Sequence, residues 1–197
     1  MKRALPWLVC TVVALAACGT VSKNEGGYYK DDGPPDRVPS NLAQAPDAMP
    51  RWEPLHRFAN RPYEVLGRKY TPFTQLRPYK ERGIATWYGK RFQGKPTSSG
   101  EPYDMYAMTA AHRVLAIPSY ARVTNLGNGR SVVVRINDRG PFQDGRLIDL
   151  SFAAAYKLGY VGQGRARVEV EAIIPSQMST GPRLRPLLHA AAHEPEG

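Results

Sequence analysis

Cysteine is nearly absent from this chain of 197 residues, which has only Cys10 and Cys18. Both lie close to the N-terminus, so the rest of the sequence can build no disulfide framework, no cysteine-ligated metal site and no cysteine nucleophile. The four histidines are scattered along the chain. We therefore expect neither a metal nor another cofactor. The folded part must be stabilised by its apolar core.

Long hydrophobic runs are also lacking. The one extended apolar segment, residues 5–17, follows Lys2 and Arg3 and is too short to span a bilayer, which is typical of a secretory signal. It ends in Leu-Ala-Ala before Cys18, the pattern of bacterial lipoprotein signals, in which the cysteine is acylated. We expect residues 1–17 to be a lipoprotein signal peptide and Cys18 to carry a membrane anchor. Ordinary signal cleavage beside a chance cysteine is the alternative.

Acidic residues are the minority charge, with 17 Asp and Glu against 27 Lys and Arg, and the formal net charge is +10. We expect the export signal to direct the chain out of the cytoplasm. Outside the cytoplasm, nucleic acid is not an expected partner. A scattered basic surface there favours polyanionic envelope material such as cell wall or lipid head groups. For any single Lys or Arg, a simple solvated surface is the more common explanation.

Proline divides the chain. Half of the 18 prolines fall between residues 19 and 79, where no sustained helical or strand periodicity accompanies them. We expect residues 18–79 to be an extended and largely unstructured tether, whose more apolar part, residues 62–70, packs on the domain as an N-terminal arm. Residues 175–197 are interrupted by Pro182 and Pro186, and we expect a disordered tail.

Residues 80–174 have the pattern of a small β domain. A short helix is predicted between an N-cap at Ser151 and a stop at Gly159. The pair Asn128-Gly129 predicts a tight hairpin. Strands are predicted where short apolar or β-branched runs are bounded by turn residues: 83–89, 120–125, 131–136, 147–150 and 167–174. This combination predicts a mainly β fold, a small barrel.

Three residues in turn-rich segments could carry chemistry. Glu101 follows Ser-Ser-Gly and precedes a proline, and a solvated turn glutamate is the alternative. Asp138 ends a β-branched strand just before Gly-Pro, and an Asx-type turn that only caps backbone is the alternative. His112 lies beside small residues, where a structural histidine is the common case. Several aromatic residues lie near these segments and could pack on sugar rings, although core filling explains at least half of them.

Together these segments resemble the RlpA (rare lipoprotein A) family. The matching residues are 83–89, 100–104, 109–112, 123–126, 135–142 and 148–151, with the arm at 62–72 and the lipoprotein signal. The resemblance implies a six-stranded double-psi β-barrel with one or two short helices. It implies a lytic transglycosylase that cleaves MurNAc–GlcNAc bonds in glycan strands lacking stem peptides, leaves 1,6-anhydro ends, and serves wall remodelling and daughter-cell separation.

By motif position, the family's functional residues fall on Glu101, His112 and Asp138. We expect Asp138, on its rigid strand end, to act as general acid and then base. Glu101 would stabilise positive charge or orient the glycan, and His112 would orient a carboxylate or a sugar hydroxyl. The substrate contacts that we expect are Trp87, Tyr88, Tyr103, Asn137 and Arg139.

The resemblance also implies a cellular location. It implies a protein that faces the periplasm, and Gly19 after Cys18 favours the outer over the inner membrane. We expect a monomer. Many family members carry a C-terminal SPOR domain, and the residues after Ile174 are too few for one, so we expect none. A non-catalytic peptidoglycan-binding module and a structural envelope lipoprotein are the alternatives to the enzyme.

Overall fold

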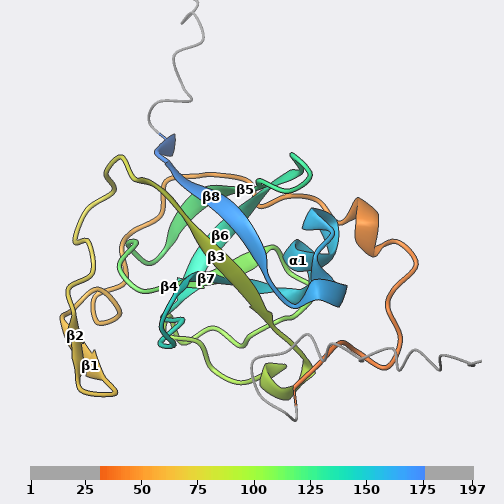
Figure 1. Ribbon diagram of the computed structural model, residues 1–197. Coiled ribbons are helices and arrows are strands. Elements are labelled where there is room, and N and C mark those ends of the chain that lie inside the picture. Colours follow the sequence, from red (N-terminus) through yellow and green to blue (C-terminus); the bar gives the residue numbers. More distant parts are fainter. Residues whose placement is uncertain (1–31, 176–197) are drawn as a thin grey trace, which may run out of the picture.

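A closed six-stranded barrel forms the body of the protein (Figure 1), in a computed structural model that describes residues 32–175. Around the barrel the strand order is β3-β7-β4-β6-β5-β8. The strands are Lys80–Tyr88 (β3), Thr109–His112 (β4), Ser119–Asn125 (β5), Ser131–Asp138 (β6), Arg146–Ser151 (β7) and Ala166–Ile173 (β8). The predicted barrel is therefore confirmed, with every predicted strand in place.

Two parallel pairs, β3 with β7 and β4 with β6, lie among antiparallel neighbours. A parallel pair cannot be closed by a tight hairpin, so the members of each pair are separated in sequence by other strands of the barrel. The loops of residues 89–108, from β3 to β4, and 139–145, from β6 to β7, carry Glu101, Tyr103 and Arg139. His112 and Asp138 lie at the ends of β4 and β6. The topology is that of the double-psi β-barrel that the resemblance implies.

The helix α1 (Phe152–Leu158) has the predicted boundaries. The Ser151 hydroxyl accepts a hydrogen bond from the Ala154 amide, and Gly159 ends the helix with φ 75°. Its apolar face is buried against the barrel, where Phe152 packs edge-on against Trp87 at 5.5 Å between ring centroids. Three short 3-10 helices complete the regular structure: η1 (Leu42–Gln44), η2 (Lys90–Phe92) and η3 (Val161–Gln163).

Two local features differ from the sequence prediction. The strand β4 has the sequence Thr-Ala-Ala-His, which has little β propensity, and it is held by pairing with β6 on one edge and β7 on the other. The hairpin between β5 and β6 is present, but its loop covers residues 126–130 and only Gly129 takes a positive φ. It is therefore a longer loop, and the two-residue turn suggested by Asn-Gly does not form.

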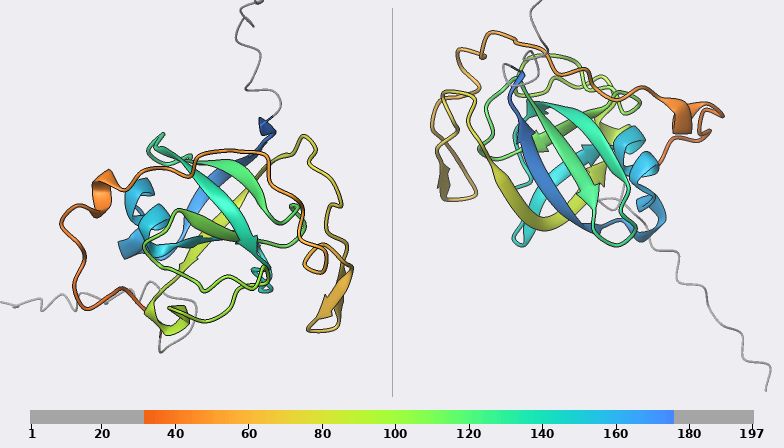
Figure 2. Two further views of the ribbon diagram at one scale, coloured as in Figure 1. Left: turned by 180° about the vertical axis from the view of Figure 1, so that it is seen from behind. Right: turned by 90° about the horizontal axis from the view of Figure 1, so that it is seen from above.

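Residues 32–61, which we name the strap, lie along the barrel. They have little regular structure, as proline predicts, and they cross the barrel from the side of α1 to the hairpin of β1 (Tyr63–Val65) and β2 (Arg68–Tyr70) (Figure 2, left). The expectation of a largely unstructured tether is corrected for this part. Backbone hydrogen bonds join it to the barrel: the Ala48 amide donates to the Val133 carbonyl (3.0 Å) and the His56 amide to that of Ile117 (2.8 Å).

Several predictions fall elsewhere in the chain. The signal peptide 1–17, the acylated Cys18, the start of the tether and the tail from residue 176 lie outside the described residues. Between residues 32 and 175, none of the helices has the length and apolar character needed to cross a membrane.

The side chain of Asn60 joins the strap to the barrel. This buried amide accepts from the Ile117 amide (2.8 Å), donates to the Ile117 carbonyl (2.7 Å), and accepts from the Arg139 guanidinium (2.8 Å). Removing it leaves several buried groups without partners. We predict that Asn60→Ala lowers the free energy of unfolding by about 2–3 kcal/mol, measured by chemical denaturation.

The matched control is Asn41→Ala, at an exposed strap position whose side chain makes no capping bond. It should change the free energy of unfolding by less than about 0.5 kcal/mol. An effect of Asn60→Ala as small as that of the control would mean that this contact does not stabilise the protein.

Candidate functional site

Asp138 is fixed at the end of β6 by three hydrogen bonds. Its Oδ1 accepts from the Ser98 amide (2.8 Å), the Ser98 hydroxyl (2.6 Å) and the Arg139 amide (2.7 Å). The loop that carries Ser98 is tied to the same strand end, since the Ser99 amide donates to the Asn137 carbonyl (3.1 Å). Asp138 thus caps backbone, as the turn interpretation held, and the same bonds give its carboxylate a rigid mounting.

The barrel places Asp138 in one row with a second carboxylate. Ala111 on β4 is paired with Asp138 on β6 and also with Asp149 on β7, and Asp149 is paired in turn with Thr86 on β3. Two strand spacings separate the aspartates, so their Cα atoms lie about 10 Å apart. Both carboxylates and Ala111 line one pocket of about 320 Å³. Its other walls come from Val65, Leu66, Tyr88, Phe92, Arg139, Gly140, Pro141 and Phe142.

Asp149 has an unusual environment for a carboxyl group. Burial raises its pKa to about 6, although the hydrogen bond from the Thr86 hydroxyl and the positive charges of Arg146 and Arg113 oppose this shift. The negative charge of Asp138 adds to it. The pocket therefore contains a carboxyl group that holds its proton more strongly than an ordinary aspartate.

Glu101 belongs to a neighbouring ion-pair cluster and does not line the pocket. Its Oε2 accepts from Arg135 (2.7 Å) and Asn137 (3.1 Å), and Arg135 also binds both carboxylate oxygens of Glu53 in the strap. Burial opposes ionisation, but the hydrogen bonds from Arg135 and Asn137 outweigh it and hold the pKa of Glu101 below its usual value. Glu101 is thus an ionised group that anchors the loop of residues 97–101.

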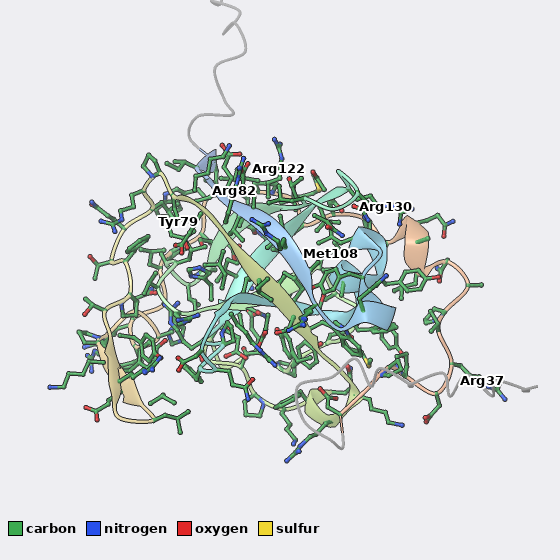
Figure 3. The ribbon with its side chains drawn as sticks, viewed as in Figure 1. Arg37, Tyr79, Arg82, Met108, Arg122 and Arg130 are labelled. Carbon is green, nitrogen blue, oxygen red and sulfur yellow. The ribbon has the colours of Figure 1, made fainter. Side chains whose placement is uncertain are left out.

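His112 is buried away from both predicted carboxylates. Its Nδ1 accepts from the amides of Val114 (3.2 Å) and Leu115 (3.0 Å), so the ring proton resides on Nε2, which lies 3.1 Å from the hydroxyl of Tyr79 (labelled in Figure 3). Burial, helped by the positive charge of Arg139, lowers the pKa of His112 to about 3. The neutral ring fixes the turn of residues 112–115, and its hydrogen bonds go to neither Glu101 nor Asp138. The expected role of His112 toward a carboxylate or a sugar hydroxyl stays a prediction.

That turn holds Arg139. The guanidinium donates to the carbonyls of His112 (3.0 Å) and Leu115 (2.6 Å), and in the strap to the Ala59 carbonyl and the Asn60 side chain. Burial lowers the pKa of Arg139 to about 10, so it remains charged at neutral pH. Arg139 lines the pocket, but its side-chain donors are used to join the strap and the turn of residues 112–115 to the end of β6, beside Asp138.

Known proteins are similar in sequence to most of this chain. Endolytic peptidoglycan transglycosylase RlpA of Vibrio cholerae is 49% identical over 185 residues, which cover 93% of this chain and 68% of that protein. The chain belongs to the RlpA family. The profile of the lytic transglycolase family matches residues 80–170.

Two further proteins with the same name extend the comparison. That of Neisseria meningitidis serogroup A is 58% identical over 131 residues, covering 66% of this chain and 55% of that protein. That of Pseudomonas aeruginosa (strain UCBPP-PA14) is 56% identical over 137 residues, covering 70% and 40%. The chain thus spans about half the length of these two relatives.

The RlpA barrel uses most of the expected sugar-binding side chains internally. Trp87 is 1% exposed and lies in the core, and Tyr103 is 2% exposed and donates from its hydroxyl to the Tyr88 carbonyl (2.5 Å). Asn137 is also buried, against Glu101. Of the aromatic residues named as contacts, Tyr88 alone lines the pocket. Core filling therefore accounts for Trp87 and Tyr103.

Asp149 is the pocket residue that sequence reasoning missed. It lies in the predicted strand Leu-Ile-Asp-Leu, where a carboxylate among apolar residues was the available signal. Within the described part of the chain, no group of three or more His, Cys, Asp and Glu side chains is arranged to hold a metal ion. The carboxyl groups that line the pocket are those of Asp138 and Asp149.

The environment of His112 predicts a pH-dependent stability. The unfolded chain binds a proton at His112 below about pH 6.5, and the folded protein does not until about pH 3. Stability is therefore lost as the pH falls through this window, by up to about 1.4 kcal/mol per pH unit from this residue. His112→Asn removes this contribution, so the free energy of unfolding of the variant should fall less steeply than that of wild type between pH 6.5 and 4.5 in denaturant titrations. Parallel pH dependences of the two proteins, or a His112 ring that titrates near 6.5 by NMR, would contradict the assignment.

Proposed function

We propose that this RlpA-family protein is an endolytic peptidoglycan lytic transglycosylase that cleaves the MurNAc–GlcNAc bond. The observation that carries the proposal is the pocket at the end of β6, which is lined by two aspartates that lie on either side of Ala111 in the sheet. The relatives' printed name supports the same substrate and reaction. Aromatic rings at Tyr88, Phe92 and Phe142 supply an apolar wall on which a sugar ring can pack.

Cleavage of this bond requires few catalytic groups from the protein. One carboxylic acid must protonate the leaving oxygen, and the oxocarbenium-like state at C1 must be stabilised, which a carboxylate can do. The 6-hydroxyl of the same MurNAc then attacks C1 and closes the 1,6-anhydro ring, so no water molecule has to be activated. Asp138, rigidly mounted in the pocket, is one of the two groups that this chemistry uses.

Glu101, His112 and Arg139 act around this pair as positioning residues. Glu101 ties the loop of residues 97–101 to β6 through Arg135 and Asn137, and that loop carries Ser98 to Asp138. His112 shapes the turn that holds Arg139.

The proposed substrate is a glycan strand without stem peptides, reached from a lipid anchor on Cys18. The signal at residues 1–17 supports an envelope protein that faces the periplasm, and Gly19 favours the outer membrane. Fractionation of a Cys18→Ala variant tests this membrane location, since loss of the acyl anchor should release the protein from the membrane.

We predict that the purified protein releases 1,6-anhydro-muramyl products from amidase-treated sacculi. Asp138→Asn should lower the initial rate by at least about 100-fold, because it removes a group that acts directly on the reacting bond. The matched control is Asp36→Asn in the strap, where an exposed carboxylate pairs with Lys90. It should retain the wild-type rate.

Products would be identified by mass spectrometry of the soluble fragments. Terminal reducing muramic acid in place of the anhydro form would make the protein a hydrolase. Binding of sacculi without any release would favour the non-catalytic peptidoglycan-binding module.

A further inference from the structure

We propose that Asp149 is the general acid of this reaction and that Asp138 is the anion that stabilises the positively charged transition state. The assignment rests on the proposed function and divides its two roles between two specific residues. It also revises the expectation, drawn from the rigidity of its strand end, that Asp138 is the acid.

The pairing register brings the two aspartates to one site. Ala111 is the partner of both, so Asp138, Ala111 and Asp149 form a straight row across β6, β4 and β7. All three line the same pocket, and the small side chain of Ala111 leaves the space between the carboxylates open. With Cα atoms about 10 Å apart, two strand spacings, the carboxyl groups flank a gap the size of a sugar ring.

The charged groups around Asp149 come from every strand that contacts it. Thr86 on β3 donates to its Oδ1, Arg146 lies on its own strand, and Arg113 follows β4. Asp138 lies across the row, and the hydroxyls of Tyr88 and Tyr160 feel the charge of Asp149 from the buried side. Burial raises the pKa of Asp149 to about 6, so an appreciable fraction is protonated near neutral pH, as a general acid requires.

Asp138 differs from Asp149 in its hydrogen bonds. Three donors, two of them backbone amides, converge on its Oδ1 and fix the carboxylate at the edge of the pocket. One carboxyl group that donates a proton and a second that stabilises positive charge is the usual division of labour in glycoside cleavage.

The step balances without any further reactant. The carboxyl proton of Asp149 passes to the glycosidic oxygen as the C1–O bond breaks, and GlcNAc leaves with a new 4-hydroxyl. Positive charge at C1 is held by the Asp138 carboxylate. The MurNAc 6-hydroxyl then attacks C1 and returns its proton to Asp149. The acid is regenerated, and no electrons are exchanged with any other group.

Two substrates with different leaving groups distinguish the role of Asp149 from that of Asp138. Asp149→Asn should cleave denuded glycan at least about 100-fold more slowly than wild type, because the leaving oxygen is no longer protonated. A 4-nitrophenyl glycoside of a MurNAc-terminated oligosaccharide needs no protonation, so the same variant should release nitrophenol within about tenfold of wild type. Asp138→Asn should be slow on both substrates, and the control Asp36→Asn should be unaffected on both.

A second variant tests whether the protonation of Asp149 controls the rate. The Thr86 hydroxyl lowers the pKa of Asp149, so Thr86→Val should move the alkaline limb of the pH–rate profile to higher pH. A purely structural role of Asp149 would leave that limb unmoved. This readout decides the question even if wild type does not accept the nitrophenyl substrate.

Three outcomes would overturn the assignment while the proposed function stands. They are a wild-type rate for Asp149→Asn on denuded glycan, equal losses on the two substrates in a variant with a native circular dichroism spectrum, and an alkaline limb that Thr86→Val does not move. A wild-type protein that makes no 1,6-anhydro product would instead contradict the function itself.

Discussion

The double pairing of β4 is the constraint on which the site depends. A strand of only four residues lies between β6 and β7, parallel to one and antiparallel to the other, and its Ala111 is the partner of an aspartate on each side. Closure of the barrel fixes this register, because a one-residue slip would turn every side chain of β4 to the other face. The spacing of the two carboxylates is therefore a property of the barrel rather than of flexible loops.

The part of the chain before the barrel takes part in the same construction. Asn60 and Ala59 of the strap hold the guanidinium of Arg139, and Glu53 binds Arg135 beside Glu101. The hairpin that follows the strap adds Val65 and Leu66 to the wall of the pocket. The segment that composition suggested to be only a spacer thus completes the site from residue 32 onward.

The sequence predicted five of the six barrel strands, the helix with both of its caps and the position of Asp138, because each of these has a local signal. It did not reach β4, whose Ala-Ala core has no strand propensity, or Asp149, whose importance comes from a partner 38 residues away in the row. Proline correctly indicated an extended strap, but its docking depends on single contacts such as Asn60, which composition cannot reveal. His112 was found by its motif, although its role in a turn depends on burial that only the fold shows.

The most direct test of the account is a crystal structure of the Asp149→Asn protein with a denuded glycan tetrasaccharide. We predict that the scissile oxygen lies within about 3.2 Å of the side chain at position 149, with C1 facing Asp138 and the sugar ring above Ala111. A glycan bound elsewhere on the barrel, with the row of Asp138, Ala111 and residue 149 free of sugar, would contradict it.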